Sequence, residues 1–438
     1  MHESIRRCFA TISGLVNAQA RSVLLIPSGF HRSTIAQLYR CPRDHTWWGN
    51  VEEPMEGLVS HVLQPEESGR FHRIWEFVYN KGNALPEGRS WTYDGDIVLG
   101  VEVHGQPAGA AILGRHQVNR SGATLSMGAV AEVGVLPEYR LAGVGREIMR
   151  LALETMVEEG MQLSCLYAFR EPYYRNMGYE VSGIRTEIKC PGHRLPNPPV
   201  TLPLRQISAQ DFHELKPCYE AFARSHNGAT LRTDAQWRRR FGIRTPLIYA
   251  VGDPVEAYFW TQMEGWFWED LSLGEVVWST ARGYESLMGA LNGLCINRTA
   301  LTWFEPEQGP FAAQYLDQGM SVSASRWTMW RVLDMVSSME ALRPHSTGSF
   351  VVQIDDENLA ANTGSWLVEF SPEGVSCSPT QQSPDIVSGI APWSQAFLGS
   401  PSLTRLVELG KIECKDPEKL RVASNILSPN SVVCTEFF

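Results

Sequence analysis

The stretch that most constrains the fold is residues 133–149, where a strand, a proline, a tight loop and a helix follow one another. It reads VGVLPEYRLAGVGREIM. Residues 133–135 are apolar and mostly β-branched, and Pro137 ends the strand that they predict. Apolar residues then recur at helical spacing. Two glycines at this junction, Gly143 and Gly145, allow the backbone to approach a ligand closely.

The start of a helix carries N–H groups without acceptors and binds anions, so this junction predicts a site for a phosphate or pyrophosphate. No Lys-Ser/Thr pair follows the glycines, which excludes a Walker A loop, and the pattern is not Gly-x-Gly-x-x-Gly either. Arg140-x-x-Gly-x-Gly after a Val-x-Val-x-Pro strand resembles the acetyl-CoA loop of the GNAT acetyltransferases. The alternative is an ordinary strand-to-helix turn that uses glycine only for its conformational freedom.

Length and charge bound the possible classes of protein. A chain of 438 residues should hold about two to four domains. The net charge of −10 argues against a nucleic-acid-binding surface and agrees with a cationic substrate. The nine cysteines are odd in number and contain no Cys-x-x-Cys pair, which indicates reduced thiols in a cytoplasmic protein. No run of about 18 apolar residues is present, so we expect no membrane span.

Residues 1–56 form no recognisable unit, and we treat them as an N-terminal extension. Arg6-Arg7, a short apolar run and Ala18-Gln-Ala20 faintly resemble a signal peptide, which leaves secretion open as an alternative.

Three units follow in the hydropathy pattern. The first, 57–195, has a strand, a helix, a three-strand meander (96–103, 108–114 and 126–135), the helix 143–159 and a strand at 162–168. A proline-rich linker leads to the second unit, 204–342, which has helices at 211–223, 236–241 and 284–292, and aromatic strands at 257–260, 266–271 and 275–279. The third, 345–438, predicts a strand at 350–354, a hairpin, and helices at 386–398 and 402–409.

Further segments extend the resemblance. Residues 168–179 (AFREPYYRNMGY) resemble a segment with a fixed Tyr and a closing Gly-Tyr that marks one GNAT branch, and residues 330–335 (WRVLDM) resemble that branch's exit from its second GNAT-like domain. The C-terminal end resembles its sterol-carrier-like domain, in NTG from Asn362, PDI from Pro384, FLG from Phe397, LGKI from Leu409 and the terminal Phe438. In this order the motifs resemble the Eis ("enhanced intracellular survival") family, which acetylates aminoglycosides, over about residues 57–438.

The resemblance implies the fold class. It predicts an α/β and α+β protein, with tandem GNAT-like domains of mixed, mostly antiparallel sheet and flanking helices, followed by a sterol-carrier-like α+β domain. The GNAT domain would be 57–195, the second GNAT-like domain without a cofactor motif 204–342, and the third domain 345–438. A homohexamer is implied as well.

The resemblance also implies site residues. Acetyl-CoA is the co-substrate, Tyr174 the general acid and the α-carboxylate of Phe438 the general base. The acetyl-CoA contacts fall at Val133, Gly134, Val135, Arg140, Leu141, Ala142, Gly143, Val144, Gly145 and Arg146, and at Phe169 and Arg170.

Two departures from the family pattern affect these contacts. The family's loop is rich in arginine, whereas Leu141-Ala142 leaves Arg140 and Arg146 as its cations here, so backbone N–H groups should carry more of the phosphate binding. Phe169-Arg170 replaces a Ser-Glu-like pair and changes the charge near the reacting centre.

Acetyl transfer from a thioester to an amine needs an acid for the leaving thiolate and a base for the amine. A tyrosine hydroxyl, with a pKa of about 10, suits the acid role, and the alternative for Tyr174 is a core residue packed with Tyr173 and Tyr179. A strand amide within residues 133–135 could polarise the thioester carbonyl.

The identity of the base is open. An α-carboxylate, with a pKa of about 3.3–3.7, needs burial or a water to act as a base, and Phe438 could instead be an apolar anchor at a subunit interface. The rival base is Glu132 on the strand, unless it is only an outward-facing strand residue. Glu436 could bind a cationic acceptor, or could be an exposed tail carboxylate.

The sequence thus predicts an acetyl-CoA-dependent N-acetyltransferase of a small cationic amine, aminoglycoside-like or polyamine-like, without a metal or nucleic acid. A lysine side chain on a protein is the alternative acceptor. An acyl-CoA sensor, or an apolar-ligand-binding protein with an inactive GNAT domain, is the alternative of another class.

Overall fold

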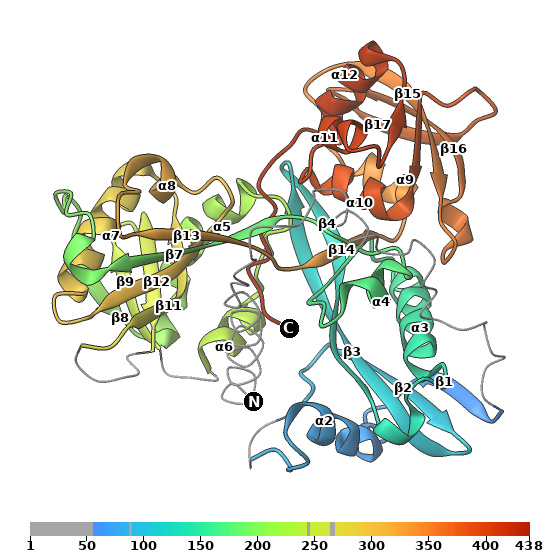
Figure 1. Cartoon of the computed structure of the whole chain (residues 1–438), viewed down its shortest axis with the longest axis horizontal. Helices are drawn as coiled ribbons and strands as arrows, with labels where there is room; N and C mark the ends of the chain where they lie inside the picture. Colours follow the sequence, from blue (N-terminus) through green and yellow to red (C-terminus); the bar gives the residue numbers. More distant parts are fainter. Residues whose placement is uncertain (1–55, 87–89, 243–245, 263–267) are drawn as a thin grey trace, which may run out of the picture. The chain divides into compact units, whose positions relative to one another are not determined.

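The computed structural model describes residues 56–438 except 87–89, 243–245 and 263–267. Its described residues form three sheets, of seven, seven and five strands (Figure 1). Two compact units share them: residues up to 112 together with 132–151, and residues 113–131 together with 152–438. The extension and the signal-like segment predicted in residues 1–55 lie outside the described residues. The mixed sheets with flanking helices confirm the predicted fold class.

The first unit builds one end of the first sheet. Its elements are β1 (Leu58–Val62), the 3-10 turn η2 (Ser68–Phe71), α2 (His72–Tyr79), β2 (Ile97–Val103), the start of β3 (Gln106–Arg120), the end of β4 (Ala123–Val135) and the start of α3 (Val144–Glu158). His104 and Gly105 close the turn between β2 and β3 with φ angles of 50° and 75°. Val144 and Ile148 on α3 pack against Val101 and Ala108 to form this unit's core.

The first sheet has the order β1-β2-β3-β4-β5-β14-β6. In the second unit, β4 runs parallel to β5 (Leu163–Leu166), with the register from Met127↔Leu163 to Val130↔Leu166. Strand β14 (Met329–Val332) pairs antiparallel with both β5 and β6 (Glu180–Val181), although it comes from much later in the chain.

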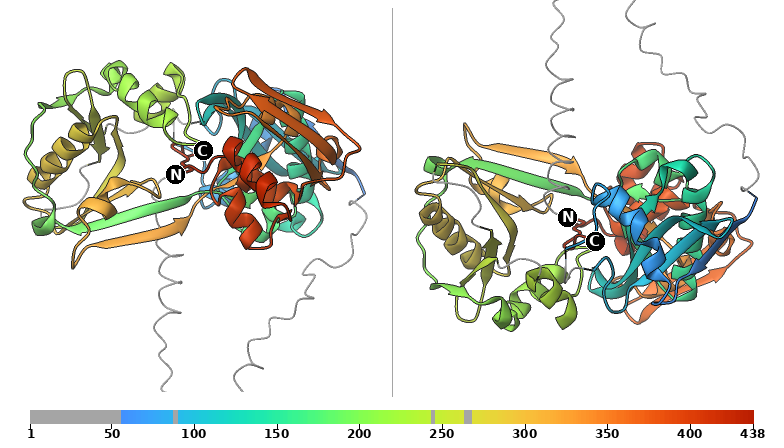
Figure 2. Two further views of the ribbon diagram at one scale, coloured as in Figure 1. Left: turned by 90° about the horizontal axis from the view of Figure 1, so that it is seen from above. Right: turned by 90° about the horizontal axis from the view of Figure 1, so that it is seen from below.

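The second sheet has the order β13-β7-β12-β11-β10-β9-β8, all within the second unit. Figure 2 shows its long strands β7 (green) and β13 (orange) side by side. Its strands are β7 (Ile184–Pro191), β8 (Leu204–Ile207), β9 (Leu247–Val251), β10 (Ala257–Thr261), β11 (Leu271–Trp278), β12 (Ala300–Glu305) and β13 (Ser321–Arg326). Its helices are α5 (Lys216–Arg224), α6 (Asp234–Gly242), α7 (Ala281–Leu294) and α8 (Pro310–Gln314). Buried aromatic rings fill both faces, with Trp303 on one and Trp237 on the other.

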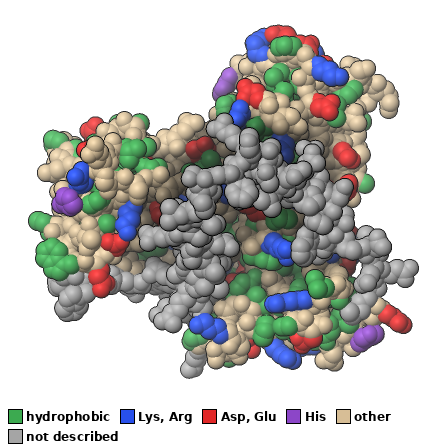
Figure 3. Space-filling model, in the orientation of Figure 1, with side chains coloured by type: hydrophobic (Ala, Val, Ile, Leu, Met, Phe, Trp, Pro, Cys, Tyr) green, Lys and Arg blue, Asp and Glu red, His purple; other side chains and the backbone are tan. Residues whose placement is uncertain are grey.

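The third sheet has the order β17-β16-β15-β18-β19. Its strands are β15 (Gly348–Asp355), β16 (Gly364–Ser371), β17 (Gly374–Pro379), β18 (Ile386–Gly389) and β19 (Glu413–Cys414), and the helices are α9 (Met335–Glu340), α10 (Ile390–Leu398), α11 (Leu403–Glu408) and α12 (Pro417–Ile426). Its core is continuous with that of β4, β5 and β14, because α10 packs on β14. On the face drawn in Figure 3, acidic and basic side chains of this region are interspersed.

Two strands near the expected domain boundaries belong to a different sheet from the one that their place in the chain suggests. Strand β7 was expected in the first domain, but it pairs with β12 and β13 in the second sheet. Strand β14 was expected in the second domain, but it completes the first sheet. The boundaries near 195 and 204 therefore do not coincide with the division between the two sheets.

Three predicted elements were wrong in detail. The helix expected at 211–223 is the 3-10 turn η5 (Ala209–Glu214) followed by α5, because Asp211 leaves the helical conformation and Pro217 starts a new helix. The helix expected at 386–398 begins only at Ile390, after four residues of strand. The strand expected at 266–271 lies partly outside the described residues, and the chain becomes a strand only at Leu271. In the described part of the chain, no helix is both long and apolar enough to cross a bilayer.

Candidate active site

The predicted cofactor loop has the geometry of a strand-to-helix junction. Strand β4 ends at Val135, a short 3-10 turn covers Pro137–Tyr139, and α3 begins at Val144. Gly143 has a φ of 83°, and a Cβ at this position would meet nothing within 4 Å. The chain therefore needs glycine here for its backbone conformation, and the space beside it is open.

The side chains around this loop leave its backbone accessible. Leu141 has a φ of 66° and is 93% exposed, and Arg140 and Arg146 are exposed as well. The Nε of Arg140 donates to the carbonyl of Val135 at 3.3 Å, which folds the loop back on the strand end. The loop thus combines the first N–H groups of α3 with two exposed cations, which are the groups that bind anionic ligands.

A backbone distortion lies just before this loop. Glu132 has a φ of 49°, which a non-glycine residue in a strand rarely adopts. Trp75 Nε1 donates to the carbonyl of Glu132 at 2.8 Å, and the Tyr79 hydroxyl donates to the carbonyl of Val133 at 2.8 Å. Two side chains of α2 therefore hold the distorted strand in place, which the sequence pattern of β4 alone did not reveal.

Glu132 also affects its surroundings electrostatically. Burial raises the pKa of Tyr79 well above its usual value, and the negative charge of Glu132 raises it further. The Glu132 side chain lies close to that hydroxyl and is half-buried, so it is not the outward-facing strand residue that alternation predicted.

In the second unit, Tyr174 lies on α4 (Glu171–Arg175) and is 2% exposed. Its ring centroid is 5.0 Å from that of Tyr173, 5.6 Å from Phe169 and 6.3 Å from Tyr179. The Tyr179 hydroxyl shares a hydrogen bond of 2.7 Å with Ser164, and burial raises its pKa to about 12. Tyr174 therefore sits in the predicted aromatic cluster, beside the exposed Phe169 that lies in the predicted acetyl-CoA segment.

The C-terminal tail, residues 431–438, is fixed along its length. Asn227 N donates to Ser431 O at 3.0 Å, and Val433 N donates to Asn227 O at 2.8 Å. The Tyr167 hydroxyl donates to the carbonyl of Glu436. The ring of Phe438 lies 5.3 Å from Tyr167 and 5.7 Å from His116, so the terminus is packed and does not fray as chain ends usually do.

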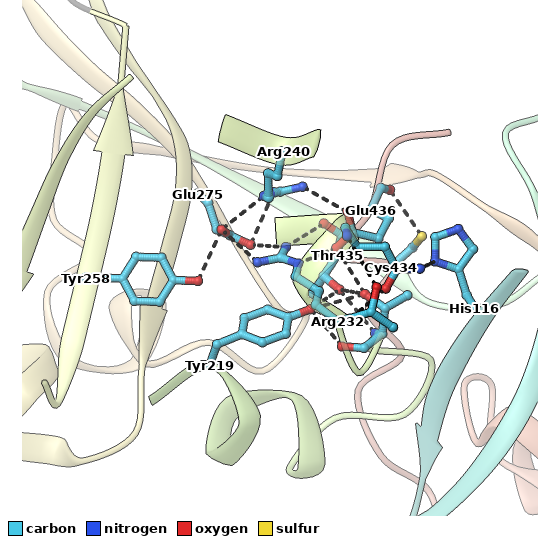
Figure 4. Close-up of polar contacts among 12 residues, drawn as sticks. His116, Tyr219, Arg232, Arg240, Tyr258, Glu275, Cys434, Thr435 and Glu436 are labelled. Carbon is cyan, nitrogen blue, oxygen red and sulfur yellow. Dashed lines mark hydrogen bonds and ion pairs between the residues drawn. The ribbon is translucent and has the colours of Figure 1, made fainter. Parts of the chain in front are cut away.

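A buried charge cluster of Arg232, Arg240, Glu275 and Glu436 holds the same tail (Figure 4). Arg232 donates from Nε to Glu436 and from a terminal nitrogen to Glu275 at 2.6 Å, and its side chain is fully buried. Arg240 lies 3.2 Å from Glu275 and 3.3 Å from Glu436.

The electrostatics of this charge cluster are balanced. Burial alone would raise the pKa of Glu436, but the charges of Arg232 and Arg240 outweigh it and hold that pKa at about 2. The Glu436 side chain is only 11% exposed, so the expectation of an exposed tail carboxylate was wrong. The four charges come from residues 232, 240, 275 and 436, and no local pattern could have indicated their meeting.

The predicted residues are divided between the two units. The loop residues 133–146 lie in the first unit, while Phe169, Arg170, Tyr174 and Phe438 lie in the second. Among the described residues, no three His, Cys, Asp or Glu side chains gather as a metal site requires.

Comparison with known families identifies two parts of the chain. Residues 61–182 match the acetyltransferase (GNAT) domain model, and residues 332–435 match a sterol carrier protein domain. An uncharacterized N-acetyltransferase of Streptomyces griseus is 23% identical over 323 residues, which are 67% of this chain and 77% of that protein.

Solved structures of other proteins share this fold. A probable N-acyltransferase of Enterococcus faecalis V583 superposes with a TM-score of 0.77 at 17% identity, over 87% of this chain and 100% of that one. Eis1 from Mycobacterium abscessus superposes with a TM-score of 0.72 at 20% identity, over the same shares. The chain is a GNAT N-acetyltransferase, with a GNAT acetyltransferase domain and a C-terminal sterol carrier protein domain, and its fold is similar to that of Eis1.

Proposed function

We propose that this enzyme transfers the acetyl group of acetyl-CoA to an amine of a small cationic acceptor, aminoglycoside-like or polyamine-like. Tyr174 acts as the general acid, and the α-carboxylate of Phe438 acts as the general base. The observation that carries the proposal is the packed C-terminus, since a terminal carboxylate can serve as a base only if its position is fixed.

The loop of residues 137–146 fits the pyrophosphate of the co-substrate. Gly143 leaves open space beside a helix start, and Arg140 and Arg146 offer cations at its edge. The backbone N–H groups of the loop would make most of the contacts with the phosphates, because the loop holds fewer cations than is usual in the Eis family that the sequence resembles.

The acid and base have distinct tasks. The Phe438 carboxylate accepts the proton that the ammonium group of the acceptor must lose before its nitrogen attacks the thioester. The ring of the same residue packs against Tyr167 and His116, which restricts the position of the terminus. The Tyr174 hydroxyl donates a proton to the departing thiolate. Because the side chain is buried among aromatic rings, its orientation is restricted.

The experiment measures thiol release from acetyl-CoA with aminoglycosides, polyamines and lysine peptides as acceptors. A variant with two alanines added after Phe438 should lose about 100-fold or more in kcat while calorimetry shows unchanged acetyl-CoA binding. Tyr174→Phe should lose about as much, whereas Tyr173→Phe in the same aromatic cluster should stay near the wild type.

Other outcomes select other assignments. Turnover that survives the extension but not Glu132→Gln would make Glu132 the base. Turnover only with lysine peptides would move the acceptor to proteins. Acetyl-CoA binding without turnover of any amine would contradict the proposal and favour a sensor. The hexamer and the cytoplasmic location stay predictions, and light scattering of the purified protein tests the first.

A further inference from the structure

The charge cluster lies at one particular point of the tail, two residues before the terminus. Glu436 accepts from Arg232 Nε, and the neighbouring Thr435 carbonyl accepts from Arg232 Nη2 at 3.2 Å. The Thr435 hydroxyl is 2.7 Å from both the Tyr219 hydroxyl and the Thr230 hydroxyl. Successive residues of the tail are thus held from one side by α5 and the segment after it (Figure 4).

Arg232 is the centre of this arrangement. Its guanidinium carbon lies 3.9 Å from the ring centroid of Tyr219 and 4.7 Å from that of Trp237. These rings and the two carboxylates fix the plane of the guanidinium, which in turn fixes where Glu436 can sit. A fully buried arginine with a fixed guanidinium holds the Glu436 carboxylate in one place, whereas a solvated lysine could follow it as it moves.

We propose that Arg232 is a positioning residue for catalysis, which binds Glu436 and thereby sets the place of the Phe438 α-carboxylate. This inference rests on the proposed function, in which that carboxylate is the base. Two residues span at most about 7 Å, so a fixed Glu436 confines the terminus to a small region. A base displaced by about 1 Å can slow an enzyme by about 100-fold.

The charge balance explains why the anchor is ionic. The charge cluster contains two cations and two carboxylates, and a tail that detaches leaves Arg232 and Arg240 with Glu275 alone. Detachment of the tail therefore leaves two buried arginines with only one carboxylate between them, and an uncompensated buried charge is strongly unfavourable. Residues 431–433 are held by Asn227 instead, so the charge cluster acts on the last residues in particular.

The experiment compares Glu436→Gln, Arg232→Met and the double variant with the wild-type enzyme. Carboxypeptidase A, which removes a C-terminal Phe, reports on tail docking without any acetyl transfer. Each single variant should release Phe438 at least about ten times faster, lower kcat by about 30- to 100-fold and leave the KM for acetyl-CoA within about twofold.

The double variant separates positioning from stability. It removes one cation and one carboxylate together, so it should recover thermal stability while kcat stays low and Phe438 stays accessible. Recovery of kcat along with stability would overturn the positioning role. The control is Arg282→Gln, which breaks the ion pair with Glu256 in the same part of the fold and should change neither Phe438 release nor kcat.

The two-alanine extension distinguishes the failure of this inference from that of the proposed function. If the extension abolishes turnover but Glu436→Gln keeps wild-type kcat, the terminal base stands and the positioning role is refuted. If turnover survives the extension, the terminal base itself is wrong. Loss of turnover in both, with faster Phe438 release in Glu436→Gln, supports both statements.

Discussion

Replacing Glu436 with Gln should loosen the docked tail strongly at pH 7 and only weakly at pH 3. Glutamine removes the negative charge but keeps nearly the same shape, so it mimics the protonated acid at every pH. The groups that face this side chain are Arg232, Arg240, Glu275 and His116. The two arginines dominate, because they lower the pKa of Glu436 despite its burial.

The magnitude follows from that pKa. It lies at about 2 in the folded protein, against an ordinary value of 4.5 for glutamate. Each tenfold change in the acid dissociation constant corresponds to about 1.4 kcal/mol, so the ionised side chain stabilises docking by about 3 kcal/mol at pH 7. Because the pKa of Glu436 is lower in the folded state than in the unfolded state, the stabilisation is complete at pH values above the unfolded-state pKa. It is lost as the pH falls through the folded-state pKa. About 1 kcal/mol should therefore remain at pH 3.

Hydrogen exchange of peptides from residues 227–240 and 431–438 measures this difference. The wild type should exchange about 300 times more slowly than Glu436→Gln at pH 7, and about ten times more slowly at pH 3. Comparing the two proteins at the same pH cancels the intrinsic pH dependence of exchange. Glu418→Gln, which breaks the exposed ion pair with Arg421, is the control and should give a ratio near one throughout. A ratio that is constant with pH, or that grows toward pH 3, would refute the reasoning.

Four other substitutions test the fold, the loop and the distorted strand. Gly178→Ala should lower the free energy of unfolding, measured in urea, by about 3 kcal/mol or more, because the new Cβ would lie 1.6 Å from Nη1 of the buried Arg331 and the residue has a φ of 77°. Gly160→Ala is the matched control: its φ is 68° but the space around it is open, so the loss should be about 1 kcal/mol. Gly143→Ala should raise the KM for acetyl-CoA about fivefold with little change in kcat, and an unchanged KM would argue against a phosphate site. Tyr79→Phe loses the hydrogen bond to the carbonyl of Val133, so urea unfolding should show a loss of about 1 kcal/mol in stability. The loss in kcat/KM, expressed as an activation free energy, should be larger than about 1 kcal/mol, because the distorted strand leads into the cofactor loop. An unchanged kcat/KM would argue against a role of this strand in activity.

Local patterns predicted the secondary structure of those segments of the candidate site that are continuous in the chain. The loop of residues 133–146 was recognisable because a strand end, a proline, two glycines and a helix follow one another directly. The hairpin of β16 and β17 was predicted for the same reason: two short strands follow one another directly, and Gly374 comes at the turn between them. The late start of α10 was missed because Ile386–Gly389 can serve as either strand or helix, and only the pairing of β18 with β15 decides.

Distant contacts were beyond the sequence. The strained φ of Glu132 depends on Trp75 and Tyr79, which hold its strand from another helix. The ion pair of Glu436 depends on Arg232, about 200 residues earlier. Such pairs involve no spacing or period that a single sequence displays, so the tail appeared to be exposed.

The late arrival of β14 has a consequence for how the chain folds as it is made. Strand β5 pairs with β4 on one side, and its other side is covered only when Trp330 reaches Cys165. Until then the nascent protein presents the open edge of a strand with three apolar residues out of four, which is a template for wrong pairing with a neighbouring chain. A fragment that stops at residue 200 should therefore aggregate even though it contains the whole segment that matches a GNAT domain. Ribosome-bound chains should acquire protease resistance in this sheet only after residue 332 has left the exit tunnel.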